Sequence, residues 1–392
     1  MPRIVIVGAG FAGITALQRL AASLNPGDST EVVILERSSF FYQVVGAPRA
    51  YVNENYEKNM FIPFDKSIPA NAQGFVRFVR AVVTAITPTQ VTYAPVNAGD
   101  EIASETQSLA FDYLILAMGS AYTAPIRPDP NDFSRARTEQ KLREVRDHIA
   151  GAQNILVVGG GFVGCEVAGD IADHYPTKHV TLLASRNHLV PNDKVNDKLR
   201  VKTLEGLQKL KVEVVLGERL LERPSGNVLE KRSFTTDKGT VIEADIMLLC
   251  AGYSPCSELV KAMDASLLDA DGHIRVNDKL ELDDPKYSHI FAIGDVGNHP
   301  TPKLAVCAGS QAKHLASELV AVVRKKQTCV TKPFPRGESV LLFLSLGSNG
   351  GVSQVPLFGY DWVAGNFITR MFKAKDMMAG LVWRAVGATM PQ

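Results

Sequence analysis

Two stretches of the chain carry one shared pattern, and this repetition restricts the fold more than any other feature of the sequence. Residues 4–13 read IVIVGAGFAG and residues 155–164 read ILVVGGGFVG. In each copy, the apolar run predicts a strand that is buried on both faces, and the glycines predict a tight turn. The alanine- and leucine-rich stretches 14–22 and 165–172 then predict helices. Each copy is therefore expected to fold as strand, turn and helix.

The repetition continues beyond these turns. A second strand is expected at 31–36 in the first copy and at 179–184 in the second. Farther along, residues 112–119 (DYLILAMG) match residues 245–252 (DIMLLCAG) position by position, and each reads as a buried strand that ends in a glycine turn. A third strand of this kind is expected at 290–293. Strands that alternate with helices in this way indicate a parallel sheet in each unit.

The order of these strands predicts an α/β protein with two Rossmann-like dinucleotide-binding domains, the second inserted in the first. A small α+β segment is expected at the C-terminal end. The chain of 392 residues is long enough for two or three domains. The expected boundaries are 1–120 and 266–335 for the first domain, 121–265 for the second and 336–392 for a C-terminal domain that covers the dinucleotide and acceptor site.

The composition restricts the partners of the protein. With 42 Lys and Arg against 41 Asp and Glu, the net charge is +1, so no overall field favours nucleic acid, and no nucleic-acid partner is expected. No apolar run reaches the ~18–20 residues that span a bilayer, so any membrane contact would be peripheral. The oligomeric state stays open.

Cysteines and histidines give little sign of metal or disulfide chemistry. The five cysteines lack C-x-x-C spacing, which fits a reducing compartment, so we expect a cytoplasmic protein. Peripheral contact with membranes or lipid droplets stays open. The eight histidines lack ligand spacing, so we expect no metal site. Residues 1–164 contain no cysteine, Cys165 stands alone, and Cys250 and Cys256 flank a glycine turn. These cysteines are expected to be packing residues.

The glycine pattern has a specific use when it joins a strand to a helix. Gly8 permits the turn, Gly10 lets the backbone approach a pyrophosphate, and Gly13 lets helix and strand pack closely. The helix N-terminus adds free N–H groups and partial positive charge. Glu36 ends the second strand, where a carboxylate accepts hydrogen bonds from ribose hydroxyls. Two such sites in one chain suggest electron transfer from a nicotinamide donor to a bound flavin.

The glycine motif at 8–13, the strand and turn at 112–119 and the pair Gly294-Asp295 resemble the two-dinucleotide-binding-domain flavoprotein reductases, over about residues 1–330. The resemblance implies FAD in the first unit and NADPH or NADH in the second. It also implies that Asp295 binds the ribityl chain and that Glu166 faces the nicotinamide.

Motifs and resemblance together give the expected cofactor-binding residues. In the first unit they are Gly8, Gly10, Phe11, Ala12, Gly13, Glu36, Arg37, Arg49, Val83, Ala117, Gly119, Gly294, Asp295, Lys303, Leu304 and Ala305. In the second unit they are Gly159, Gly161, Val163, Gly164, Glu166, Ser185, Arg186 and Gly252.

A narrower resemblance concerns the end of the chain. Residues 301–303 (TPK), 347–354 (GSNGGVSQ) and 373–376 (KAKD) are similar to the ferroptosis suppressor branch of the apoptosis-inducing-factor-like flavoproteins. This branch implies an FAD-dependent NAD(P)H:quinone oxidoreductase, in which hydride passes to flavin N5 and electrons then reach a ubiquinone-like acceptor. The catalytic residues so expected are Glu166, Lys373 and Lys303. Some members carry a myristoylated glycine after the initiator methionine, but Pro2 stands there in this chain, so lipid anchoring is not implied.

Several charged residues keep two interpretations. Arg49 and Lys303 either stabilise the reduced flavin at the isoalloxazine edge or are solvated surface charges. Glu166 either faces the nicotinamide or compensates the helix dipole. The basic, amphipathic stretch 367–384 either docks onto the flavin domain or contacts a membrane surface.

The end of the second strand predicts which nicotinamide is used. Ala184 stands where the first unit has Glu36, so the carboxylate that repels a 2′-phosphate is missing. Ser185 and Arg186 follow, with His188 nearby. A hydroxyl and a guanidinium bind a phosphate dianion by charge-assisted hydrogen bonds and gain less from a neutral hydroxyl. We expect NADPH to be accepted at least as well as NADH. The alternative is a strand end that turns into solvent with Arg186 pointing away.

Two rival functions share these motifs. A type II NADH dehydrogenase would sit on a respiratory membrane, and a redox-sensing binding protein resembling apoptosis-inducing factor would signal in its reduced form. The second usually implies a basic nucleic-acid-binding surface, for which the charge balance gives no support.

Overall fold

The larger of two parallel sheets is built from both ends of the chain. The computed structural model describes residues 1–129, 132–327, 329–335 and 340–391. This sheet contains, from one edge to the other, β17 (Ile290–Ala292), β8 (Tyr113–Leu116), β1 (Arg3–Val7), β2 (Glu31–Glu36), β5 (Val76–Ile86), β6 (Gln90–Pro95) and β7 (Gln107–Ala110). The pairs from β17 to β5 are parallel, whereas β6 and β7 extend the edge as antiparallel strands.

The second sheet comes from the chain between β8 and β17. Its strands, all parallel, are in spatial order β12 (Glu213–Leu216), β11 (His179–Ala184), β10 (Asn154–Val158) and β15 (Ile246–Leu249). One unit is thus inserted in the other, as predicted, and the α/β fold class is confirmed. Residues 237–239 lie in the turn between the antiparallel strands β13 (Arg232–Thr235) and β14 (Val241–Ala244).

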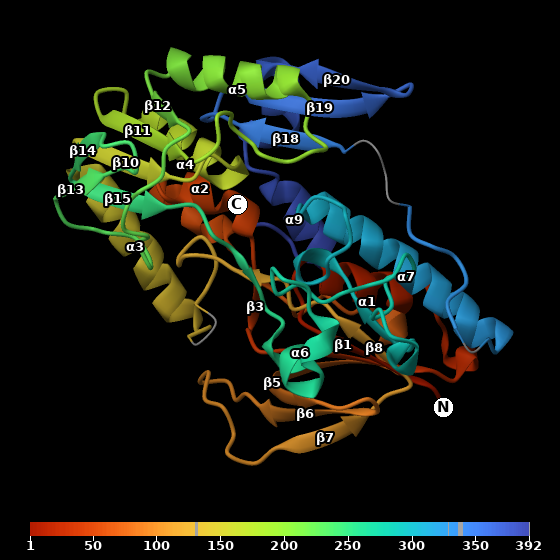
Figure 1. Cartoon of the computed structure of the whole chain (residues 1–392). Helices are drawn as coiled ribbons and strands as arrows, with labels where there is room; N and C mark the ends of the chain where they lie inside the picture. Colours follow the sequence, from red (N-terminus) through yellow and green to blue (C-terminus); the bar gives the residue numbers. More distant parts are fainter. Residues whose placement is uncertain (130–131, 328, 336–339, 392) are drawn as a thin grey trace.

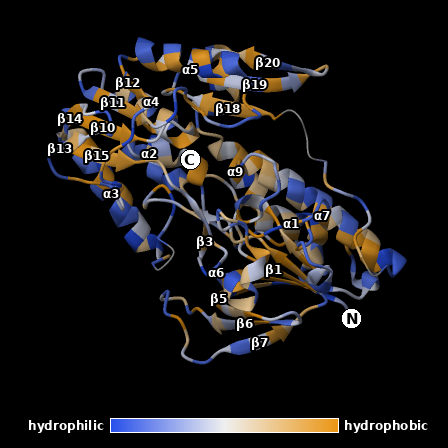
Figure 2. Cartoon of the chain, in the orientation of Figure 1, coloured by the Kyte–Doolittle hydropathy of each residue, from blue (hydrophilic) through white to orange (hydrophobic). Residues whose placement is uncertain are grey.

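Helices cover these sheets in layers (Figure 1). In the first unit, α1 (Phe11–Ser23) packs beside α7 (Ala305–Lys325), while α6 (Glu258–Met263) packs near β5. In the second unit, α4 (Phe162–His174) packs on β10 and β11, with α3 (Arg135–Gly151) and α5 (Asp197–Lys209) flanking it. Figure 2 shows hydrophobic residues concentrated in the strands and the inner helix faces, which is where the buried core lies.

Short elements connect the two units. The chain passes from the first unit to the second at β9 (Ser120–Ala121) and returns at β16 (Ser254–Pro255), and these two strands pair with each other in antiparallel fashion. The pair β3 (Phe40–Tyr42) and β4 (Phe61–Pro63) and the short helix α2 (Ala47–Ala50) belong to the first unit, and α2 packs against α4 of the second.

The end of the chain adds a third layer. A sheet of β18 (Leu342–Ser345), β19 (Gly351–Leu357) and β20 (Tyr360–Ala364) packs against α5 of the second unit. Then α8 (Asn366–Thr369), a π-helical turn (Arg370–Ala374) and α9 (Ala379–Val386) lead back to α1 of the first unit. This is the predicted α+β segment. Its expected first residues, 336–339, lie outside the described residues.

Candidate active site

A cavity of about 850 Å³ lies where both glycine turns, the strand ends and the C-terminal segment meet. This volume is in the usual range for ligand and cofactor sites. Predicted residues of the first unit that line the cavity are Gly8, Gly10, Phe11, Ala12, Glu36, Arg37, Val83, Ala117, Gly119, Gly294, Asp295, Lys303, Leu304 and Ala305. From the second unit the lining includes Gly159, Gly161, Val163, Glu166, Ser185 and Gly252, and from the C-terminal segment Lys373.

The two glycine turns have the same geometry. A Cβ added to Gly13 would lie 1.8 Å from the Gly8 carbonyl oxygen, and one added to Gly164 would lie 1.8 Å from the Gly159 oxygen. The third glycine of each turn is therefore required for the close approach of helix and strand. This is why Gly13 and Gly164 do not line the cavity, although both were predicted as cofactor-binding residues.

The middle glycines face open space. A Cβ at Gly10 or Gly161 would meet no atom within 4 Å. Each of these residues is the N-cap of a helix, and neither α1 nor α4 has a side-chain cap or an acidic residue in its first turn. The first N–H groups of both helices are thus available to a phosphate. This arrangement fits the diphosphates of FAD and of NAD(P)H.

Backbone hydrogen bonds align the ends of β2 and β11. The Gly8 amide donates to the Leu35 carbonyl at 2.9 Å, and the Gly159 amide donates to the Leu183 carbonyl at the same distance. The next residue is Glu36 in one unit and Ala184 in the other, which agrees with the sequence alignment of the two copies.

The surroundings of these two residues differ. Glu36 accepts hydrogen bonds from the Ala9 amide at 2.6 Å and the Ser38 amide at 2.8 Å, so its carboxylate is held at the cavity wall. Beyond Ala184, Ser185 lines the cavity, whereas the exposed Arg186 does not. The described conformation thus matches the alternative interpretation, in which Arg186 points into solvent.

Asp295 has two partners that the sequence analysis did not identify. Its carboxylate accepts hydrogen bonds from the Ser120 hydroxyl and the Arg127 guanidinium, both at 2.8 Å. Arg127 also lies over the Tyr122 ring, 5.4 Å from its centroid. The position of Ser120 after the Gly119 turn was a usable signal, but no motif marks Arg127.

Lys303 lines the cavity and is half-buried rather than a solvated surface charge. Its ammonium donates a hydrogen bond to the Gly297 carbonyl. Burial lowers the pKa of Lys303, and the nearby Asp295 carboxylate opposes this effect.

Glu166 and Lys373 meet at the cavity although they are far apart in the sequence. The Lys373 Nζ donates to Glu166 Oε1 at 2.5 Å, and both side chains are buried. The Ser345 amide and hydroxyl donate to the same oxygen at 3.0 and 3.1 Å, and the lysine also donates to the Phe343 carbonyl at 3.2 Å. The carboxylate therefore has an ion-pair partner from another segment, beyond compensation of the helix dipole.

Arg49 lies elsewhere than predicted. It does not line the cavity, nor is it a surface charge. Its guanidinium forms a buried ion pair with Asp170 at 2.9 Å and donates to the Ala374 carbonyl at 3.0 Å. The reason is that α2 packs against α4, whose buried carboxylate attracts the nearest cation. Desolvation, opposed in part by Arg49, raises the pKa of Asp170 to about 6.

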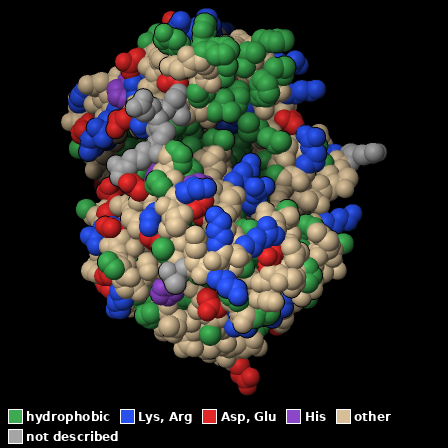
Figure 3. Space-filling view, turned by 90° about the vertical axis from the view of Figure 1, so that its right-hand side faces the viewer, with side chains coloured by type: hydrophobic (Ala, Val, Ile, Leu, Met, Phe, Trp, Pro, Cys, Tyr) green, Lys and Arg blue, Asp and Glu red, His purple; other side chains and the backbone are tan. Residues whose placement is uncertain are grey.

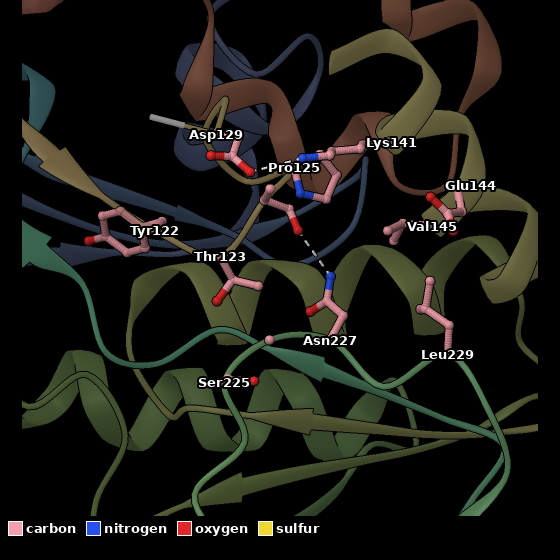
Figure 4. Close-up of a pocket in the computed structure, with 12 residues that line it drawn as sticks. Tyr122, Thr123, Pro125, Asp129, Lys141, Glu144, Val145, Ser225, Asn227 and Leu229 are labelled. Atoms are coloured by element: carbon pink, nitrogen blue, oxygen red, sulfur yellow. Dashed lines mark hydrogen bonds and ion pairs between the residues drawn. The ribbon is translucent and has the colours of Figure 1, made fainter. Parts of the chain in front are cut away.

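A smaller cavity of about 400 Å³ lies at the joint between the units (Figure 4). Asn227 points toward the turn at 123–125, donates to the Ala124 carbonyl at 3.2 Å and accepts from the Leu249 amide at 2.9 Å. Lys141 and Asp129 form an ion pair of 3.0 Å at its rim. These contacts fasten the connecting segment to β15, and none of the predicted site residues takes part.

The cysteines do not form a redox pair. All five are free thiols, and burial raises the pKa of Cys165 strongly and that of Cys250 to about 12. A thiol with a raised pKa is a poor nucleophile at neutral pH. Within the described ranges, no three His, Cys, Asp or Glu side chains gather in a way that could hold a metal ion. Over the same part of the chain, no helix is both long enough and apolar enough to cross a membrane.

Relatives in sequence cover nearly the whole chain. Apoptosis-inducing factor homolog B of Dictyostelium discoideum is 29% identical over 96% of this chain and 94% of that protein. Ferroptosis suppressor protein 1 of Homo sapiens is 29% identical over 99% of this chain and 96% of that protein. Fe-regulated protein 8 of Mycosarcoma maydis is 31% identical over 90% of this chain and 88% of that protein. These similarities confirm the resemblance inferred from the sequence.

Solved structures share the fold. Reduced Bacillus anthracis CoADR-RHD superimposes with a TM-score of 0.65 and 22% identity, over 90% of this chain and 61% of that longer chain. Putidaredoxin reductase, in its covalent complex with putidaredoxin, gives a TM-score of 0.63 and 21% identity, over 92% of this chain and 83% of that chain.

Family membership follows from a match over most of the chain. Residues 2–312 match the family described as pyridine nucleotide-disulphide oxidoreductase. This range contains both glycine turns and β17, the strand with which the chain returns to the first sheet. The chain therefore belongs to the pyridine nucleotide-disulphide oxidoreductase family and is an FAD-dependent NAD(P)H oxidoreductase.

Proposed function

We propose that the protein is an FAD-dependent NAD(P)H:quinone oxidoreductase with a ubiquinone-like acceptor. The observation that carries the proposal is the buried ion pair of Glu166 and Lys373, which joins the nicotinamide helix α4 to the C-terminal segment at the cavity wall. Such a pair supplies a proton donor where an acceptor would meet the flavin. The similarity to Ferroptosis suppressor protein 1 over nearly the full length supports the same assignment.

The proposal gives each part of the chain a task. Residues 1–120 and 266–335 bind FAD, residues 121–265 bind NAD(P)H, and the C-terminal domain from 336 covers the acceptor site. Glu36 orients the adenosine ribose of FAD, and Asp295 the ribityl chain. Ser120 and Arg127 both contact Oδ2 of Asp295, so Oδ1 would be the oxygen that accepts hydrogen bonds from the ribityl hydroxyls.

The residues of the chain position groups and transfer a proton. When bound, FAD supplies a two-electron carrier that accepts hydride from the nicotinamide and reduces the acceptor. Glu166 holds the Lys373 ammonium in the cavity wall, and Ser345 fixes the orientation of the carboxylate. The ammonium can donate a proton to a quinone oxygen and recover one from solvent through the carboxylate. The balance is quinone, NAD(P)H and one proton giving hydroquinone and NAD(P)⁺.

The thiol chemistry in the name of the family is not proposed for this chain. Reduction of a disulfide substrate needs a reactive cysteine beside the flavin, and Cys256, which lines the cavity, has a pKa raised by burial. A small or lipophilic acceptor that reaches the flavin directly fits the site better. The enzyme is proposed to work in the cytoplasm and to reach membranes or lipid droplets by peripheral contact.

Half-reactions test this proposal. The purified protein is reduced anaerobically with NADPH or NADH, and reoxidation is followed at the flavin absorbance with quinones of graded tail length and with a disulfide as the control acceptor. We expect rapid reoxidation by quinones and negligible reoxidation by the disulfide. A reduced flavin that persists with every quinone would contradict the proposal and favour a redox-sensing role.

A further inference from the structure

The C-terminal sheet has one face that is only partly covered. Leu357 of β19 is paired with Tyr360 of β20, and Trp362 lies two residues farther along, so these side chains share a face. Ser353 lies on this face as well, and its hydroxyl contacts the Thr369 hydroxyl of α8 at 2.6 Å. Helix α8 therefore covers one end of the face, while the hairpin end stays open.

The opposite face of the same sheet packs against the second unit. Gln354 accepts a hydrogen bond from the Asn196 amide, just before α5, at 2.8 Å, and it donates to the Lys194 carbonyl at 2.9 Å. Because α5 packs on β19 from this side, the uncovered face points away from the second unit.

Large apolar side chains stand out from the uncovered face and the turn after α8. Phe358 is 86% exposed, Phe367 78% and Trp362 58%. Six exposed residues define what we call the apolar patch, namely Leu357, Phe358, Tyr360, Trp362, Phe367 and Met371. Figure 3 shows hydrophobic side chains gathered at this end of the molecule, above a hollow in the surface. Contiguous exposure of this kind marks an interaction surface.

Basic residues border the apolar patch. Arg370 and Lys375 are exposed on the helical stretch that carries Phe367 and Met371, and Arg384 is exposed on α9. Residues 340–391 contain four Lys and Arg against two Asp and Glu, whereas the whole chain has a net charge of only +1.

The apolar patch and the cavity share one structural element. In the π-helical turn, Lys373 points inward to Glu166, while the preceding Met371 is exposed. Between them, Phe372 stacks on Phe343 of β18, with ring centroids 5.4 Å apart. A surface that holds the apolar patch would therefore lie next to the acceptor side of the cavity.

We propose that the apolar patch docks the enzyme onto an anionic lipid surface. Aromatic residues with a polar edge, such as Trp362 and Tyr360, are typical of membrane interfaces, and exposed Arg370 and Lys375 would meet anionic headgroups. This inference rests on the proposed function, since a lipophilic quinone is collected from lipid. A second copy fits less well, because a two-fold interface would bring the same cations together.

Vesicle flotation tests the docking surface. The FAD-loaded protein is mixed with vesicles of phosphatidylcholine, with or without phosphatidylserine. The test variant is Phe358→Ser/Trp362→Ser/Phe367→Ser. Its control is Ile102→Ser/Val201→Ser/Val241→Ser, since these three apolar residues are 52%, 56% and 60% exposed and lie outside the apolar patch. We expect the wild type and the control to float with phosphatidylserine vesicles, and the test variant to lose flotation at least tenfold.

The charged border is tested in the same way. Arg370→Glu/Lys375→Glu should abolish the gain that phosphatidylserine gives over phosphatidylcholine alone. Reduction of a short-tailed, soluble quinone should be unchanged in every variant. Flotation of the test variant at the wild-type level, or no flotation of the wild type, would overturn the docking surface. Flotation without any quinone reduction by the wild type would support the docking surface and contradict the proposed function instead.

A spectroscopic readout comes from the two tryptophans. Trp362 is exposed, whereas Trp383 is 4% exposed and donates to the Asn59 carbonyl at 3.2 Å. Added vesicles should shift the emission to shorter wavelength, and Trp362→Phe should lose this shift. An emission that vesicles leave unchanged would overturn the proposal. A test variant that sediments at half the mass of the wild type would also overturn it, because the apolar patch would then bind a second copy of the chain.

Discussion

The two dinucleotide-binding units have matching backbones but different strand ends. In both, the third glycine touches the first, the middle glycine faces the cavity, and the turn amide donates to the neighbouring strand at 2.9 Å. After that strand, one unit has Glu36, held by two backbone amides, and the other has the buried Ala184. The backbone therefore provides a diphosphate site twice, while the strand-end side chains distinguish the dinucleotides.

The units also differ in what completes them. The first obtains Asp295 and Lys303 from the chain that follows the insertion, whereas the second contributes Glu166, which is paired with Lys373 of the C-terminal segment. The cavity is thus lined by residues from both units and from the C-terminal segment. Substitutions in one unit at a time can show which residues serve flavin reduction and which serve reoxidation.

The largest effect is expected from placing a side chain on a middle glycine. Gly10→Val should remove FAD, because the added atoms occupy the space that faces the cavity. Gly161→Val should retain FAD but raise KM for NAD(P)H at least about tenfold, which corresponds to about 1.4 kcal/mol. Flavin absorbance per protein and steady-state kinetics measure the two outcomes.

Gly74→Val is the control for that comparison, since Gly74 also has no atom within 4 Å of an added Cβ but lies outside the cavity. It should keep both FAD and the wild-type KM. Gly10→Val protein that retains FAD at wild-type stoichiometry would contradict the assignment of the first unit.

The next effect concerns the ion pair at the shared wall. Glu166→Ala should slow flavin reduction by NAD(P)H and leave FAD bound, and it should slow reoxidation as well because the carboxylate holds Lys373. Lys373→Ala should mainly slow reoxidation by quinone, by about 10²–10⁴-fold if the lysine is a general acid. Stopped-flow measurement of each half-reaction separates the two steps. Unchanged half-reactions in both variants would refute these roles.

Stability must be measured beside these rates. Removing one member of a buried pair leaves an uncompensated charge, at a cost of about 3–5 kcal/mol. The double variant Glu166→Gln/Lys373→Met should recover much of that stability without recovering the rates.

Much of this arrangement could be predicted from the sequence, and the exceptions have a common cause. Local patterns dictate a glycine turn, so the positions of Gly8, Gly13 and their counterparts followed from spacing alone. Glu166 and Lys373 were predicted separately, by resemblance, and no motif indicates that they form a pair across 207 positions. Contacts between units depend on how the units pack, which no local pattern encodes.

Arg49 and Arg127 illustrate this limit. Arg49 was expected by resemblance to lie at the flavin edge, yet the buried Asp170 of the other unit attracts it. Arg127 follows an ordinary connecting segment, yet it reaches Asp295 in the cavity. In both cases a carboxylate distant in sequence determines where the cation lies.

The link between Arg49 and Asp170 predicts a pH effect that belongs to the interface of the units. The folded-state pKa of Asp170 is raised to about 6 from 3.8, so between these values the unfolded chain loses a proton that the folded chain keeps. Folding stability should therefore fall as the pH rises from about 4 to about 6, by about 3 kcal/mol for two pKa units. Chemical denaturation of the wild type and of Asp170→Asn at several pH values measures this fall in folding stability. The fall should be absent in the variant. Arg49→Met should move the window to higher pH, and a stability difference that is flat with pH would count against the raised pKa.

The smallest expected effect tests the strand ends directly, through the choice of nicotinamide. Ala184 leaves no carboxylate to repel a 2′-phosphate, and Ser185 lines the cavity beside it. Arg186 points into solvent in this conformation, but it is exposed and next to Ser185, so its side chain can swing toward a bound dianion. Arg186→Ala should raise KM for NADPH several-fold and leave KM for NADH nearly unchanged, while Ala184→Glu should copy the flavin unit and shift the preference to NADH. The ratio of kcat/KM for the two donors is the measurement, with His188→Ala as a neighbouring control. A wild-type kcat/KM that favours NADH by more than about tenfold, which corresponds to about 1.4 kcal/mol of transition-state free energy, would contradict this prediction. The missing carboxylate at Ala184 would then not determine which nicotinamide is used.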